Sequence, residues 1–199
     1  FMEVRRVSWN VGDYRRSTKA ERLMDICEEA IDEGRKIVVF SFFLDTVHFI
    51  ADMFGKLACK PIYGAVSPEE RQSIIDEFTN RADKKILVCQ IQTGGTGMNI
   101  QAASVVVICE PQYKPSIEEQ AVSRVYRMGQ TRNVIVHRLL SENTVDEEIM
   151  KILYRKQELF DIYAKQSDYV DERMIDGSNI DDIMKKQLDM YGVERSKLW

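Results

Sequence analysis

The chain has 199 residues, of which 44% are hydrophobic and 30% charged, and its formal net charge is −4. This composition is typical of a folded domain with a sizeable core, and it excludes fibrous and disordered classes. There is no long uncharged apolar run and no secretory signal at the start, so we expect no membrane span and a location inside the cell. The net charge disfavours broad non-specific binding of nucleic acid, although a local basic face could still provide it.

The first half alternates helical patterns with short β-branched runs. Apolar spacing predicts a helix from Ser17 or Thr18 to about residue 33, another over 46–57 and a third over 67–80. The run KIVVFSF (36–42) predicts a buried strand, and a shorter strand is expected over 60–63.

The second half continues the alternation. Strands are expected in KKILVCQ (84–90), ASVVVICE (103–110) and VIVHRLL (134–140), with a helix between the last two and a longer helix from Thr144 past Tyr163. Strands that are apolar on both faces, alternating with helices, predict a parallel α/β sheet covered on both sides.

This pattern predicts three parts. Residues 1–16 form a lead-in, residues 17–164 a single lobe, and residues 165–199 an acidic helical appendage with one amphipathic helix over 179–191. The chain begins with Phe1, so we expect it to be a piece of a longer protein.

The cysteine pattern predicts neither a disulfide framework nor a metal site. Four cysteines are scattered along the chain without a CxxC pair, and there are only two histidines. We therefore expect core thiols in a reducing compartment and no metal site. The cysteines are Cys27, Cys59, Cys89 and Cys109.

Two segments carry candidate chemistry. TGGTGMN (Thr93 to Asn99) directly follows a predicted strand, where open α/β sheets bind ligands, but it is neither GxxxxGK(S/T) nor GxGxxG.

In QAVSRVYRMGQ, a helix would place Gln120, Arg124 and Arg127 on one face. Such arginines fit phosphate oxygens, whereas an isolated RxxR is more often a solvated or ion-paired surface. The stretch 124–138 contains arginines and no acid.

In this order, the segments FSFF, YGAVSPEERQ, QTGGTGMNIQAASVVVICEPQYKPSIEEQAVSRVYRMGQ and VIVHRLLSENTVDEEI resemble the second RecA-like lobe of the Swi/Snf-type ATPases of helicase superfamily two. The resemblance covers roughly residues 17–160. It implies a RecA-like parallel sheet with helices on both faces, in three layers, and a C-terminal helical appendage. It also implies a lobe of an ATP-driven double-stranded-DNA translocase that remodels or displaces protein–DNA complexes.

Carried over by position, the resemblance makes Arg124 and Arg127 arginine fingers that reach ATP, with Gln120 organising their interface. It implies that Gly95, Gly97 and Asn99 link the nucleotide to the DNA side, with Gly94 making the turn. A further set would face the DNA backbone or support its groove, namely Ser41, Gly64, Arg71, Thr93, Tyr113 and Lys114.

The chain departs from the family pattern twice. YGA (Tyr63 to Ala65) stands where relatives typically read DGS, which removes a hydroxyl that Ser67 is a candidate to replace. EPQYKP stands where they typically read DPxWNP, so that Tyr113 would stack and Lys114 would meet phosphate. These departures bear on the strength of DNA binding.

The sequence lacks a Walker lysine loop and a DExH-like box, so ATP and Mg²⁺ would be held mainly by an N-terminal RecA-like lobe of the same parent chain. The parent is expected to be a DNA-dependent ATPase and this piece alone nearly inactive, with duplex DNA and a DNA-bound protein as further partners. There are two alternatives to this function: the chain is the second lobe of an RNA helicase, or it is an inert docking module. The expected location is the prokaryotic cytoplasm, or the nucleus in a eukaryote.

Overall fold

The computed structural model describes residue 9 and residues 17–95, 97–126, 130 and 132–164. Three of the sequence predictions fall outside these residues. They are most of the expected lead-in, the expected appendage over 165–199 with its helix over 179–191, and Arg127. Among the described residues, no helix is long and apolar enough to cross a bilayer.

The described elements alternate as the sequence predicts. In chain order they are α2 (Thr18–Asp32), β1 (Ile37–Ser41), α3 (Leu44–Phe54), the 3₁₀ turn η2 (Gly55–Leu57), α4 (Pro68–Asn80), β2 (Ile86–Gln90), the 3₁₀ turn η3 (Ile91–Gly95), β3 (Val105–Ile108), α5 (Pro115–Ser123), β4 (Ile135–Arg138) and α6 (Val145–Ala164).

The four strands form one parallel sheet in the order β2-β1-β3-β4. Val39 of β1 lies opposite Val88 of β2 and Val107 of β3, and Val107 in turn pairs with His137 of β4. The parallel α/β sheet expected from the sequence is therefore confirmed.

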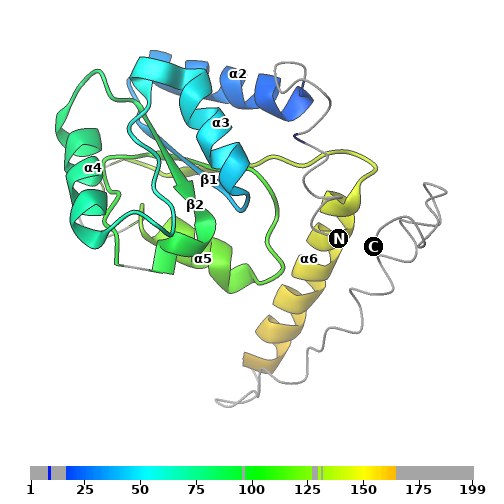
Figure 1. The fold of residues 1–199 in the computed structure, drawn as a ribbon. Helices are drawn as coiled ribbons and strands as arrows, with labels where there is room; N and C mark the ends of the chain where they lie inside the picture. Colours follow the sequence, from blue (N-terminus) through cyan, green and yellow to red (C-terminus); the bar gives the residue numbers. More distant parts are fainter. Residues whose placement is uncertain (1–8, 10–16, 96, 127–129, 131, 165–199) are drawn as a thin grey trace.

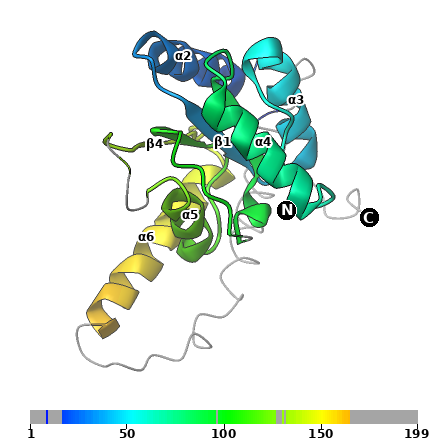
Figure 2. The same ribbon diagram turned by 90° about the vertical axis from the view of Figure 1, so that its left-hand side faces the viewer.

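Helices cover both faces of this sheet, as Figures 1 and 2 show. Ile37 and Val39 of β1 pack in the cluster with α2 and α3, whereas Val38 and Phe40 pack in the cluster with α4 and α5. Successive strand residues point to opposite faces, so a run without polar residues fills both layers. Trp9 is fully buried in the α2 and α3 cluster, so this residue of the expected lead-in belongs to the core of the lobe.

The strand expected over 60–63 does not form as a strand. The segment makes only isolated parallel bridges, Ala58 to Ile86 and Ile62 to Cys89. Pro61 has no backbone N–H, so this segment cannot supply a continuous ladder beside β2.

Helix α6 starts where the sequence predicts and leans away from the sheet (Figure 1). Its first turn is joined to α2, because Lys19 Nζ lies 2.6 Å from Asp146 Oδ2 and both side chains are buried. The two ends of the described lobe are thereby tied together.

Candidate nucleotide and DNA interface

Polar side chains gather where β1, β2 and β3 end. Ser41 of β1 lies opposite Gln90 of β2, and Glu110 follows β3 by two residues. The carboxyl ends of parallel strands meet at one edge, which is where open α/β sheets bind ligands.

Ser41 is fully buried at this edge. Its Oγ lies 3.0 Å from Glu110 Oε1, and the backbone N of Phe42 donates to Glu110 Oε2 at 3.0 Å. Glu110 is also fully buried, so these donors help to satisfy a carboxylate that would otherwise be costly to bury. Of the two roles expected for Ser41, this geometry favours support of the groove over direct contact with DNA.

Gln90 organises several of the candidate DNA residues, and sequence reasoning missed it. Its side-chain Oε1 accepts from Gly64 N at 3.3 Å, its Nε2 donates to Phe42 O at 3.4 Å, and its carbonyl accepts from Thr93 Oγ1 at 2.6 Å. The sequence did contain a signal for Gln90: it is a polar residue at the end of an otherwise apolar strand, at the edge of the sheet where ligands bind. A Cβ at Gly64 would lie 4.0 Å from Gln90 Oε1, so there is room for alanine there.

Arg71 joins this group from α4. Its Nη2 donates to the carbonyl of Gly64 at 3.1 Å. Arg71 and Gly97 also line one pocket of about 220 Å³, so the structure brings together residues that are 26 positions apart. Ser67, the candidate replacement for the missing hydroxyl, accepts from Glu70 N at 3.2 Å and caps α4.

The glycine segment runs from a tight turn into an exposed loop. Gly95 ends the turn η3, and Gly97 has φ +68°, a backbone conformation in which a side chain would be strained. Asn99 is exposed, and its Nδ2 lies 3.4 Å from Gln101 Oε1. The segment therefore presents Gly97 and Asn99 to solvent.

The arginine segment does not continue α5 as expected. Helix α5 ends at Ser123, whose Oγ donates to the carbonyl of Gln120 at 2.8 Å, and Arg124 is the C-cap. Three-residue turn bonds such as Val125 N to Val122 O follow. Arg124 still has helical φ and ψ angles of −72° and −24°, and Tyr126 N donates to the carbonyl of Val122 at 2.9 Å, so one further helical turn follows the end of α5.

The glycine and arginine segments are directly bonded. Ile100 N donates to the carbonyl of Arg124 at 3.0 Å. The chain segments that contain Asn99 and Arg124 therefore lie side by side. Gln120 is exposed on α5. Arg127 lies outside the described residues.

The residues of EPQYKP divide between two surroundings. The ring of Tyr113 packs against the α6 cluster of Val145, Ile149, Met150 and Leu153, whereas Lys114 is exposed at the N-cap of α5. Of the pair, only Lys114 is free of the core and open to an incoming phosphate.

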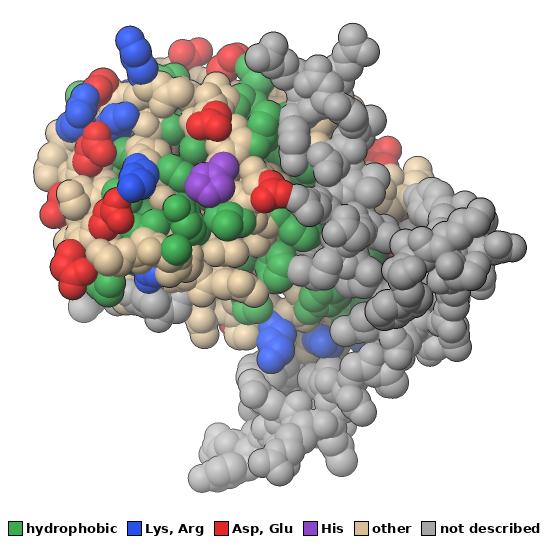
Figure 3. All heavy atoms as spheres, viewed as in Figure 1, with side chains coloured by type: hydrophobic (Ala, Val, Ile, Leu, Met, Phe, Trp, Pro, Cys, Tyr) green, Lys and Arg blue, Asp and Glu red, His purple; other side chains and the backbone are tan. Residues whose placement is uncertain are grey.

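Of the basic stretch 124–138, the described Arg132 and Arg138 do not lie on one basic face. Arg138 Nε lies 2.6 Å from the buried carboxylate of Glu118, and Arg132 Nη1 donates to Gly34 O at the amino end of the sheet. Arg132 lies before the start of β4, and Arg138 is its last residue. On the face in Figure 3, Lys and Arg are interspersed with Asp and Glu.

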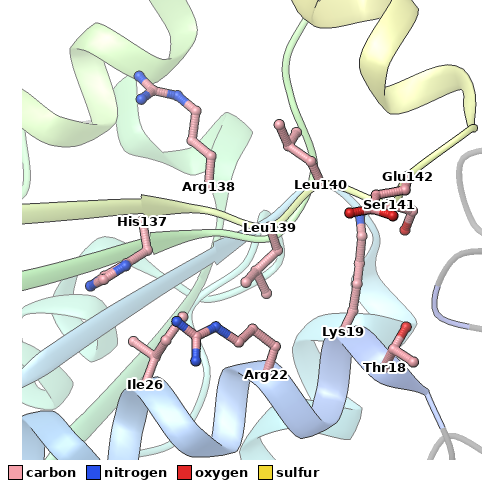
Figure 4. A pocket seen from close by; sticks show the side chains of 10 residues that line it. All are labelled: Thr18, Lys19, Arg22, Ile26, His137, Arg138, Leu139, Leu140, Ser141 and Glu142. Atoms are coloured by element: carbon pink, nitrogen blue, oxygen red, sulfur yellow. The ribbon is translucent and has the colours of Figure 1, made fainter.

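A larger pocket of about 690 Å³ lies between α2 and the end of β4. Figure 4 shows Arg22 and His137 reaching into the space between these elements. Burial and the charge of Arg22 lower the pKa of His137. None of the described candidate residues lines this pocket, and the described residues hold no group of three His, Cys, Asp or Glu side chains suited to a metal.

Sequence comparison places this lobe among helicases. The family model "Helicase conserved C-terminal domain" matches residues 18–129. An uncharacterised ATP-dependent helicase of Mycoplasma pneumoniae is 34% identical over 72% of this chain and 14% of its own length. The ATP-dependent helicase ULS1 of Saccharomyces cerevisiae is 34% identical over 73% of this chain and 9% of its own length. The chain thus spans a small part of these relatives.

Solved structures agree. The Sulfolobus solfataricus SWI2/SNF2 ATPase core domain is 34% identical with a TM-score of 0.66, covering 91% of this chain and 35% of that one. The same core in complex with double-stranded DNA is 40% identical with a TM-score of 0.60, covering 76% and 32%. The C-terminal part of the Fun30 ATPase domain, at 21% identity and a TM-score of 0.71, shares the fold. The chain belongs to the helicase C-terminal domain family and is the second, RecA-like lobe of a Swi2/Snf2-type ATPase.

Proposed function

We propose that this lobe serves a double-stranded-DNA translocase, in which it supplies Arg124 and Arg127 as arginine fingers and part of the DNA track. The parent chain would hydrolyse ATP with Mg²⁺ held mainly by its first lobe, and it would use that energy to remodel or displace protein–DNA complexes. Arginine suits this role because its planar fork of donors matches the oxygens of a transferring phosphoryl group.

The observation that carries the proposal is the hydrogen bond from Ile100 N to the carbonyl of Arg124. It joins the glycine segment, which adjoins Arg71 in one pocket, to the chain that leads to Arg127. A change on the DNA side can therefore move the arginine segment through direct contacts. The Sulfolobus core in complex with double-stranded DNA supports duplex DNA as the substrate.

The test is steady-state ATP turnover by the full-length parent protein with duplex DNA, single-stranded DNA or RNA. We expect duplex DNA to stimulate most, and Arg127→Ala to lower kcat by about a thousand-fold, as loss of an arginine finger does. Arg22→Ala is the matched control, since Arg22 is exposed, pairs with Asp25 at 3.8 Å and lines the pocket between α2 and β4, where none of the described candidate residues lies. Strongest stimulation by RNA would favour an RNA helicase, and indifference to Arg127→Ala would favour a docking module.

Displacement is tested separately. A duplex carrying a bound protein block should lose the block in the presence of ATP without separation of its strands. Release that is equal with and without ATP would contradict a translocase.

A further inference from the structure

We propose that Gln130 is a positioning residue that couples the glycine segment to Arg127. The proposal rests on the arginine-finger function proposed above. Gln130 closes the motif that carries Arg127, three positions beyond it, and its side chain bonds back to the chain that follows the glycine segment.

The contacts of Gln130 use its amide fully. Nε2 donates to the carbonyl of Gln101 at 3.0 Å and to that of Ala103 at 2.8 Å, while Oε1 accepts from Arg132 N at 3.1 Å. A primary amide has two donors and an acceptor, and all of these distances are those of good hydrogen bonds.

The chain is hydrogen-bonded to the same segment on both sides of Arg127, an arrangement that we call the bracket. Before it, the carbonyl of Arg124 accepts from Ile100 N, and after it Gln130 bonds to Gln101 and Ala103. Both flanks of the arginine segment are thus fastened to the same four residues, 100–103, which directly follow the glycine segment. Because closing a chain at both ends limits its conformations, we expect the donors of Gln130 to help position Arg127.

This bracket has a consequence for catalysis. A group that stabilises a transferring phosphoryl group acts only from the correct position, and a displacement of about 1 Å can cost about 100-fold in rate. Without the two donors of Gln130, the C-terminal flank of Arg127 is released while Arg124 stays bonded. The effect is expected on the chemical step rather than on nucleotide binding.

The experiment uses the full-length parent protein and measures kcat, the KM for ATP and the stimulation by duplex DNA. Gln130→Ala should lower kcat by about 10- to 100-fold, leave KM within about threefold and reduce the stimulation by DNA. Gln130→Glu keeps the length and the acceptor but places a carboxylate against two carbonyls, so it should be at least as impaired. Full activity of Gln130→Glu would overturn the proposal, because the donors would then be dispensable.

A double-mutant cycle separates positioning from general loss of structure. If Gln130 acts through Arg127, adding Gln130→Ala to Arg127→Ala should lower kcat no further. Gln112→Ala is the matched control, since it removes one amide bond to a carbonyl, that of Glu110 at 2.8 Å, outside this bracket. Its effect on kcat should be the same with and without Arg127.

The outcomes distinguish the two proposals. A low kcat for Arg127→Ala with normal kcat for Gln130→Ala overturns only the positioning role, as does a full further loss in the double variant. Normal kcat for Arg127→Ala overturns both. A kcat loss in Gln112→Ala that also disappears in the Arg127→Ala background would likewise remove the special role of Gln130.

Discussion

Lys19 Nζ lies 2.6 Å from Asp146 Oδ2, and this buried ion pair joins the first and the last described helices. Lys19 also donates to the carbonyl of Cys109, and the same Asp146 oxygen accepts from Ser141 N at 3.2 Å. The pair therefore fixes α2, the end of β3 and the start of α6 together. Removing one partner leaves the other charge buried without its counter-ion.

We expect Lys19→Met to lower the free energy of unfolding by about 3–5 kcal/mol, which is the usual cost of breaking a buried pair. Urea denaturation of the chain measures it. The double variant Lys19→Met with Asp146→Leu should recover much of the loss, because no charge remains buried. Lys151→Met, which removes an exposed pair with Glu148, should leave the urea midpoint nearly unchanged. Equal effects of both lysine substitutions would contradict this account.

Tyr113 and Lys114 are neighbours with separable roles. Lys114→Ala should weaken duplex-DNA binding by the full-length protein and reduce the slope of log affinity against log salt by about 0.9, as loss of one phosphate contact does. Tyr113→Ala should instead destabilise the lobe, because the ring packs against the α6 cluster. Fluorescence anisotropy over a salt series and thermal unfolding check the two effects. An unchanged salt slope in Lys114→Ala would contradict a phosphate contact.

The alternation of strands and helices could be predicted because apolar runs and amphipathic spacing are local signals. The missing strand over 60–63 could not be judged from apolar content, since a single proline decides whether a ladder can form. The end of α5 at Ser123 was missed because no glycine or proline marks it: after Pro115, the next such residue is Gly129.

The motifs of the candidate site can be read from the sequence, but the contacts between them cannot. The glycine segment and RxxR are visible as motifs, whereas the contacts that join them run through Gln130 and backbone groups, and Gln90 links the glycine segment to Gly64 instead. Backbone partners depend on how distant segments pack, and no side-chain pattern reveals them. Burial likewise decides that Ser41 bonds Glu110, a contact between residues 69 positions apart.

His137 predicts a pH dependence of stability. Burial and the charge of Arg22 lower its pKa below the ordinary value of 6.5, while Glu29 acts weakly in the opposite sense. The unfolded chain therefore binds a proton at a higher pH than the folded chain does, and the stability contributed by neutral His137 is lost as pH falls below about 6.5. His137→Gln should flatten the decline in the urea midpoint between pH 7 and pH 5. An identical decline in both proteins would contradict the shift.

The cysteines should behave as inert core thiols. All four are buried, and burial raises the pKa of Cys59 to about 11 and that of Cys27 to about 12. Because the thiolate is the reactive form, both access and ionisation oppose modification at pH 8. A disulfide reagent should therefore react slowly with the native chain and quickly in urea, releasing four equivalents. Cys59→Ser tests the fastest native phase, since Cys59 has the smaller rise of these two pKa values. A native thiol that reacts as quickly as free cysteine would show that the strand-to-helix packing opens far more readily than the buried clusters allow.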